Sequence, residues 1–167
     1  MKPKTVRRVE TGQSSGVRAH AVQTGLVAGS IVFTSDGEIP VEYLSPGDKV
    51  VTRDAGMVTL KGVSSLRVLT QAVSIKAGSL GHTRPEHNVI LPAAQRILVR
   101  DWRAQSMFGK LHTVVEAGQL IDDEFIIDLG LRPMLLVQLT FDKPHVIYAD
   151  GLEVAVPLAQ AVQSKAA

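Results

Sequence analysis

Turn signals divide most of this chain into short segments, and they limit its fold more than any other feature. Ser35-Asp36-Gly37 and Asp54-Ala55-Gly56 end in glycine, which tolerates the positive φ that tight turns need. In Ser45-Pro46-Gly47-Asp48, proline presets φ and glycine suits the left-handed position of a type II turn. Runs of Val, Ile and Leu lie between such signals, which recur roughly every 8–12 residues. The pattern predicts an all-β fold, a sandwich or a barrel-like structure with many short strands.

The individual elements follow from the same pattern. Extended patterns occur at residues 25–34, 38–41, 49–53, 57–69, 73–77, 89–92, 97–99, 114–115, 125–127, 135–141, 145–149 and 152–156. One or two short helices are expected, at residues 102–108 and 116–120, and a polar loop at residues 79–88.

Composition narrows the chemistry and the kind of core. The chain has no cysteine, which excludes disulfides, thiolate metal ligands and a cysteine nucleophile. Its 167 residues are enough for one domain with a sizeable core. Only 4% of them are aromatic, so the core should be aliphatic.

Charge is unevenly distributed along the chain. Residues 1–24 hold five Lys or Arg and one Glu, a net charge of +4, so the remainder carries +2 − 4 = −2. We expect a basic, disordered tail over residues 1–24, a β domain over 25–157 and a short C-terminal tail over 158–167. The basic tail could attract nucleic acid or an acidic surface. With no apolar stretch of membrane-spanning length and no signal peptide, we expect no membrane partner and a cytoplasmic location, with signal-less export left open.

Residues 29–50 carry the densest motif, G-S-I-V-F-T-S-D-G-E-I-P-V-E-Y-L-S-P-G-D-K-V. This block resembles the first conserved block of Hint (hedgehog/intein) domains. Residues 73–81, 95–104 and 141–151 resemble further segments of a bacterial subfamily with short stand-alone members. The resemblance covers about residues 25–156 and implies a compact, mostly β, horseshoe-shaped domain.

The resemblance also implies a chemistry whose residues are missing here. Self-processing in the family begins when a thiol or hydroxyl attacks the preceding peptide carbonyl, assisted by the histidine of a T-x-x-H motif. The nucleophile position matches Gly25, the threonine position Pro92 and the histidine position Gln95. Glutamine cannot act as a general acid near neutral pH. Asn88, the single asparagine, lies in mid-chain, so we expect no C-terminal asparagine cyclisation and no self-processing enzyme.

Some polar residues nevertheless remain candidates. Asp142 and His145 survive in the closing block, either as part of a remnant cleft or as a turn cap and the start of a strand. Ser30 and Thr34 could be nucleophiles, or could serve in hydrogen bonding within strands.

A metal site is the other candidate. His82 and His87, with Glu86 between them, are weak candidates for binding a metal, with His145 as a conceivable third ligand. The alternative is a solvated loop, and no cofactor is predicted.

Three hypotheses for function follow. The first is a non-catalytic domain that binds or assembles with a protein partner. The second is residual self-cleavage that uses Ser30 or Thr34 with Asp142 and His145. The third is binding of nucleic acid through residues 1–24.

Overall fold

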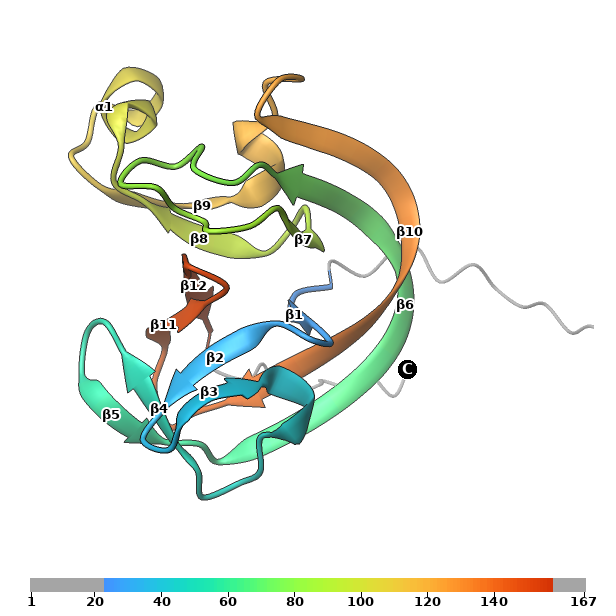
Figure 1. The fold of residues 1–167 in the computed structure, drawn as a ribbon, viewed down its shortest axis with the longest axis vertical. Helices are drawn as coiled ribbons and strands as arrows, with labels where there is room; N and C mark the ends of the chain where they lie inside the picture. The colour runs from blue at the N-terminus through green and yellow to red at the C-terminus, as the bar shows by residue number, and fades with distance from the viewer. Residues whose placement is uncertain (1–22, 158–167) are drawn as a thin grey trace, which may run out of the picture.

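The chain folds into two antiparallel β-sheets, described by a computed structural model for residues 23–157 (Figure 1). The four strands of sheet A are, in order, β1 (Leu26–Val27), β10 (Ile126–Thr140), β6 (Gly62–Ile75) and β7 (Val89–Pro92). The path of sheet B is β3 (Gly37–Pro40), β2 (Ile31–Thr34), β4 (Lys49–Thr52), β11 (His145–Ala149), β12 (Leu152–Val156), β8 (Arg96–Val99) and β9 (Thr113–Glu116), with β5 (Gly56–Thr59) paired to β4. The all-β prediction is confirmed.

Strands β6 and β10 form a long curved ladder along one side of the molecule, which produces the predicted horseshoe outline (Figure 1). The expectation of separate strands at 57–69 and 73–77, and at 125–127 and 135–141, was wrong. The apparent interruption in β10 is a bulge, since the register shifts between Asp128 and Gly130, and Gly130 has φ +70°. Pro133 also lies within β10. There β10 pairs with β6 on one side only, because β1 pairs with β10 only at Leu136 and Val137, and a strand edge without a partner tolerates a proline.

The turns between the short strands of sheet B form as their residue types predict. Thr34 Oγ1 donates to the carbonyl of Gly37 at 2.8 Å and accepts from the N–H of Asp36 at 3.1 Å. Gly47 has φ +97°, and the N–H of Asp48 donates to the carbonyl of Ser45. These hydrogen-bonded turns reverse the chain between consecutive elements of sheet B.

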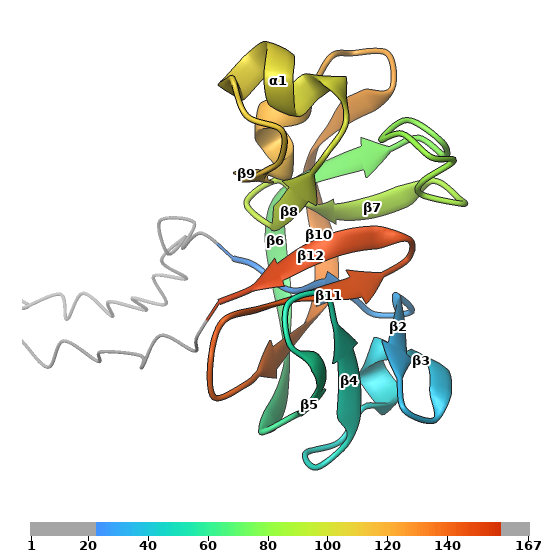
Figure 2. The ribbon, with the colours of Figure 1, turned by 90° about the vertical axis from the view of Figure 1, so that its left-hand side faces the viewer.

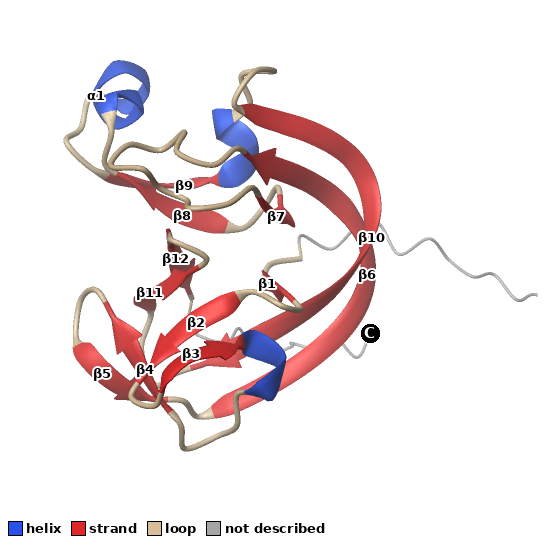
Figure 3. Cartoon of the chain, in the orientation of Figure 1, coloured by secondary structure: helices blue, strands red, loops and turns tan. Residues whose placement is uncertain are grey.

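One α-helix lies within residues 23–157, at the periphery of the sheets (Figure 3). This helix, α1 (Trp102–Phe108), begins where the Asp101 side chain accepts from the N–H of Arg103, and ends at Gly109 with φ +67°. Short 3₁₀ turns cover Val41–Tyr43 and Ala117–Leu120. No helix of the described part is long and apolar enough to cross a membrane.

The core lies between the two sheets and is aliphatic, as the composition predicts. Among the described residues, Phe141 is the one aromatic side chain in the buried core. In Figure 2 the hairpin β11–β12 crosses the middle of the molecule, with β4 and β5 on one side and β7 and β8 on the other. This central hairpin carries or contacts most of the polar groups discussed below.

Candidate functional site

Gly25 and Gln95 meet although 70 residues separate them. Gly25 lies just before β1, and Gln95 lies in the turn between β7 and β8. The N–H of Gly25 donates to Oε1 of Gln95 at 2.9 Å. The peptide that precedes Gly25 therefore contacts the side chain at the position predicted to replace the histidine.

Gln95 is 3% exposed and all of its polar atoms are engaged. Its Nε2 donates to the carbonyls of Arg96 at 3.0 Å and Ala155 at 2.9 Å. A carboxamide held in this way can accept a hydrogen bond from a peptide N–H, but it cannot deliver a proton to a leaving nitrogen.

The backbone at Gly25 leaves little room for a nucleophile. Its φ of +148° lies in a region that L side chains rarely adopt. A Cβ there would lie 3.1 Å from the carbonyl oxygen of Val137 and 3.3 Å from side-chain atoms of Leu136 and Gln138. A cysteine or serine at this position would require the chain to shift away from β10.

Pro92 shapes the same turn without offering a hydroxyl. It ends β7, pairs with Ala72 across the ladder, and its carbonyl accepts from the N–H of Gln95 at 3.0 Å. The three positions predicted to be vestigial therefore converge on one place.

Asp142 and His145 point to different partners. Nδ1 of His145 lies 2.8 Å from Oδ2 of Asp54, and the imidazole meets the Phe141 ring edge-on at 5.6 Å between centroids. Asp142 is exposed and lies 3.6 Å from Nζ of Lys61. Within residues 23–157 no hydrogen bond or ion pair joins Asp142 to His145.

Asp54 is a site residue that sequence reasoning missed, because Asp-Ala-Gly reads simply as a turn. Partial burial acts to raise the pKa of its carboxyl, but the N–H of Val146 and the imidazole of His145 outweigh burial and lower that pKa below 3.8. The N–H of Val146 donates to Oδ1 at 3.0 Å. The pair therefore joins the β4–β5 hairpin to β11.

The hydroxyl candidates are built into the fold. Thr34 is buried and its hydroxyl closes the β2–β3 turn described above. Ser30 is 8% exposed, and its carbonyl accepts from the N–H of Val41. Among the contacts described, no hydrogen bond links either hydroxyl to Asp142 or His145.

The polar loop at residues 79–88 shows no metal site. His82 and His87 are exposed, and no group of three His, Cys, Asp or Glu side chains in the described part is placed to hold a metal ion. His145 is engaged by Asp54 instead. Asn88 Oδ1 accepts from the N–H of Ala77 at 2.9 Å, so it ties the two ends of the loop together.

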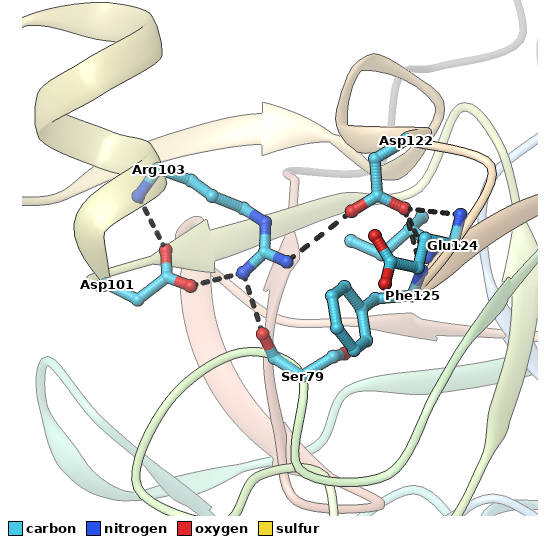
Figure 4. A network of polar contacts seen from close by, with 7 residues as sticks. Ser79, Asp101, Arg103, Asp122, Glu124 and Phe125 are labelled. Carbon is cyan, nitrogen blue, oxygen red and sulfur yellow. Dashed lines mark hydrogen bonds and ion pairs between the residues drawn. The ribbon is translucent and has the colours of Figure 1, made fainter.

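A second polar network lies beside α1 (Figure 4). The buried Arg103 guanidinium donates to the Ser79 carbonyl at 2.7 Å, pairs with Asp101 and lies 3.6 Å from Asp122. Burial acts to raise the pKa of Asp122, but the N–H groups of residues 124–126 and the Arg103 charge together lower it. The network ties α1 to the start of β10.

The two sheets and the long curved β6–β10 ladder define a horseshoe-shaped β domain of the kind found in inteins. A family model described as "Hint domain" matches residues 24–156. The chain belongs to the Hint domain family.

Solved structures of inteins and intein-like domains share the fold. The DnaB intein from Synechocystis sp. PCC 6803 superposes with a TM-score of 0.56 at 12% identity, covering 81% of this chain and 100% of that chain. A bacterial intein-like domain from Clostridium thermocellum gives 0.52 at 17% identity, covering 81% and 99%. The gp41-1 intein gives 0.52 at 12%, covering 79% and 98%. A comparison with curated proteins gave no match.

The predicted basic tail and C-terminal tail lie mostly outside the described residues, since the structure describes 23–157. The nucleic-acid hypothesis rests on residues 1–24 and therefore stays a prediction from charge.

Proposed function

We propose that this Hint domain does not self-process and that it serves as a module for binding or assembling with a protein partner. The first half of this proposal, that the domain does not self-process, rests on the hydrogen bond from the Gly25 N–H to Gln95 Oε1. It holds the peptide that a relative would cleave against a group that cannot protonate it. The crowded, positive-φ backbone at Gly25 supports the same reading.

The arrangement of the other candidates supports this proposal. Residual cleavage by a hydroxyl would need a base near Ser30 or Thr34. His145, on β11, is instead paired with Asp54. The Thr34 hydroxyl already donates to a carbonyl, so its proton and lone pair are both engaged in the turn.

Exposed apolar side chains support the second half of the proposal. Trp102, Met107 and Leu111 are 66%, 49% and 82% exposed, and all three lie on α1 or just after it. Exposed apolar surface often marks a contact with another protein, and these three side chains share one short segment of the chain. We assign the partner surface to this segment, residues 102–111.

Intact mass spectrometry tests the first half. The full chain is incubated for days at neutral pH, with and without hydroxylamine, beside a His145→Ala variant. We expect one unchanged mass in every sample. Fragments ending at Thr24 or beginning at Gly25 would overturn the proposal. Cleavage elsewhere that His145→Ala slows would favour a hydroxyl nucleophile instead.

A paired surface variant tests the second half. Leu111→Ser should reduce recovery of a partner from the source cells. Tyr43→Ser, which changes another strongly exposed side chain (72%) elsewhere, should not. Equal recovery with both variants would contradict the assignment to residues 102–111.

A further inference from the structure

Glu153 has a buried carboxylate surrounded by three arginines. Its side chain is 3% exposed. Arg53 Nη1 donates to Oε1 at 2.8 Å, Arg100 Nε donates to Oε2 at 2.8 Å, and Arg84 Nη1 lies 3.5 Å from Oε1. The arginines come from the end of β4, from the loop at residues 79–88 and from the end of β8, and they converge on β12.

Within the cluster itself, positive charge exceeds negative charge. Three guanidinium groups and one carboxylate leave a net charge of +2. The carboxylates of Asp54, Asp101 and Asp150 form no ion pair with these arginines and have other partners. Asp54 pairs with His145, Asp101 pairs with Arg103, and Asp150 accepts from the N–H of Ile31. No further carboxylate in residues 23–157 forms an ion pair with these three arginines.

The guanidinium groups also keep unused donors. Each carries five N–H donors, and within the described residues only one from Arg53 and one from Arg100 form hydrogen bonds. The three side chains are 27–35% exposed, so solvent reaches them. A cavity of about 20 Å³ opens between Arg84, Arg100, Glu153 and Gly151, with room for one water-sized group.

We propose that this cluster, Arg53, Arg84, Arg100 and Glu153, binds a phosphate group. A phosphate dianion matches the excess charge of +2, and its oxygens suit the planar fork of arginine. One oxygen can enter the cavity beside Arg84 and Arg100, while Arg53, which also contacts Oε1 of Glu153, adds positive charge. Buried Glu153 holds the arginines together and moderates their repulsion before the ligand arrives. The site does not depend on the self-processing positions or on residues 102–111.

Titration with inorganic phosphate at constant ionic strength tests the proposal. The amide resonances of Gly151 and Glu153 report on the site by NMR. We expect saturable shifts with a dissociation constant on the order of millimolar or below. Phosphoserine serves as the second probe. Binding of both probes assigns the site to a phosphomonoester, and binding of phosphate alone assigns it to the free ion.

Arg84→Gln is the decisive variant, because Arg84 makes the longest contact with Glu153 and, unlike Arg53 and Arg100, forms no hydrogen bond with it among the described residues. It should weaken binding by about tenfold or more. Arg67→Gln removes the same charge from an exposed position on β6, and should change binding by less than about twofold.

Three results would each overturn the proposal. These are the absence of saturable binding by the unmodified chain, equal affinity for acetate and phosphate, and equal weakening by Arg84→Gln and Arg67→Gln. Circular dichroism of both variants ensures that a loss of binding is not a loss of fold.

Discussion

Gln95 is a buried side chain that joins three parts of the fold through its hydrogen bonds. As acceptor from the Gly25 N–H and donor to two carbonyls, it closes a contact between β1, the β7–β8 turn and β12. A histidine could not donate to both carbonyls while accepting from that N–H. The glutamine side chain therefore stabilises this junction through three hydrogen bonds.

Gln95→Ala should lower the free energy of unfolding by about 3 kcal/mol, because a buried N–H and two carbonyls lose partners. Urea unfolding measures the loss. Gln105→Ala, the same truncation at an exposed position of α1, should cost less than about 0.5 kcal/mol. Equal losses for the two variants would show that the Gln95 bonds contribute nothing.

Gly25→Ala should destabilise more than Gly37→Ala. Both glycines have positive φ, +148° and +100°, but only at Gly25 would a Cβ meet a backbone carbonyl at 3.1 Å. The φ penalty costs about 1–3 kcal/mol at either position, and crowding adds to it at Gly25. Thermal unfolding of the two variants side by side gives the difference. A larger loss for Gly37→Ala would contradict the crowding.

At the scale of elements, short-range turn chemistry builds the hairpins and long-range polar pairs fasten them together. Asp54 fastens the β4–β5 hairpin to β11, and Arg103 fastens α1 to the start of β10. Glu153 on β12 forms ion pairs with arginines from three separate segments of the chain. These pairs join segments that lie far apart in the chain, so each one resists separation of whole elements.

Asp54→Asn should destabilise the protein more at about pH 5.5 than at about pH 3. Because the folded state lowers the pKa of Asp54, its carboxylate stabilises the fold above the ordinary pKa of 3.8. That contribution is lost as the pH falls through the lowered pKa, so the two proteins should converge in acid. Urea unfolding at both pH values measures the gap. Asp36→Asn, at an exposed turn position, should show no such convergence.

The whole molecule depends on one large, mainly aliphatic core between the two sheets, beside a small second cluster of Ala72, Met134 and Leu136. Phe141 is 2% exposed, packs in that core and contacts His145, so it joins the core to the Asp54 pair. Removing the Phe141 side chain should therefore lower the free energy of unfolding of the entire domain.

Phe141→Ala should cost about 3–5 kcal/mol, because the cavity it leaves cannot collapse fully. Differential scanning calorimetry should show one cooperative transition at a lower temperature, by about 2–4 °C per kcal/mol for a domain of this size. Phe33→Ala, at a position 40% exposed, should shift it far less. A separate early transition would show that the sheets unfold independently.

The order of the short strands, the turns and the site of α1 could be predicted from sequence, because residue type governs them locally. The same local reasoning wrongly predicted β6 and β10 as several shorter strands. A glycine bulge and a proline look like ends of a strand until a long partner strand holds the register through them. Glu153 was missed for a related reason, since a charge in Leu-Glu-Val-Ala-Val looks like a solvent-facing position.

Turn signals determined the all-β class and motif spacing determined the family, because both depend on which residue types occupy which positions. Only the tertiary structure decided which residues meet across the fold. Contacts between residues 70 to 119 apart, such as Gly25 with Gln95, His145 with Asp54 and Ile31 with Asp150, arise from how the sheets pack, and no local pattern encodes them. Gly25 and Gln95 therefore meet only in the folded chain.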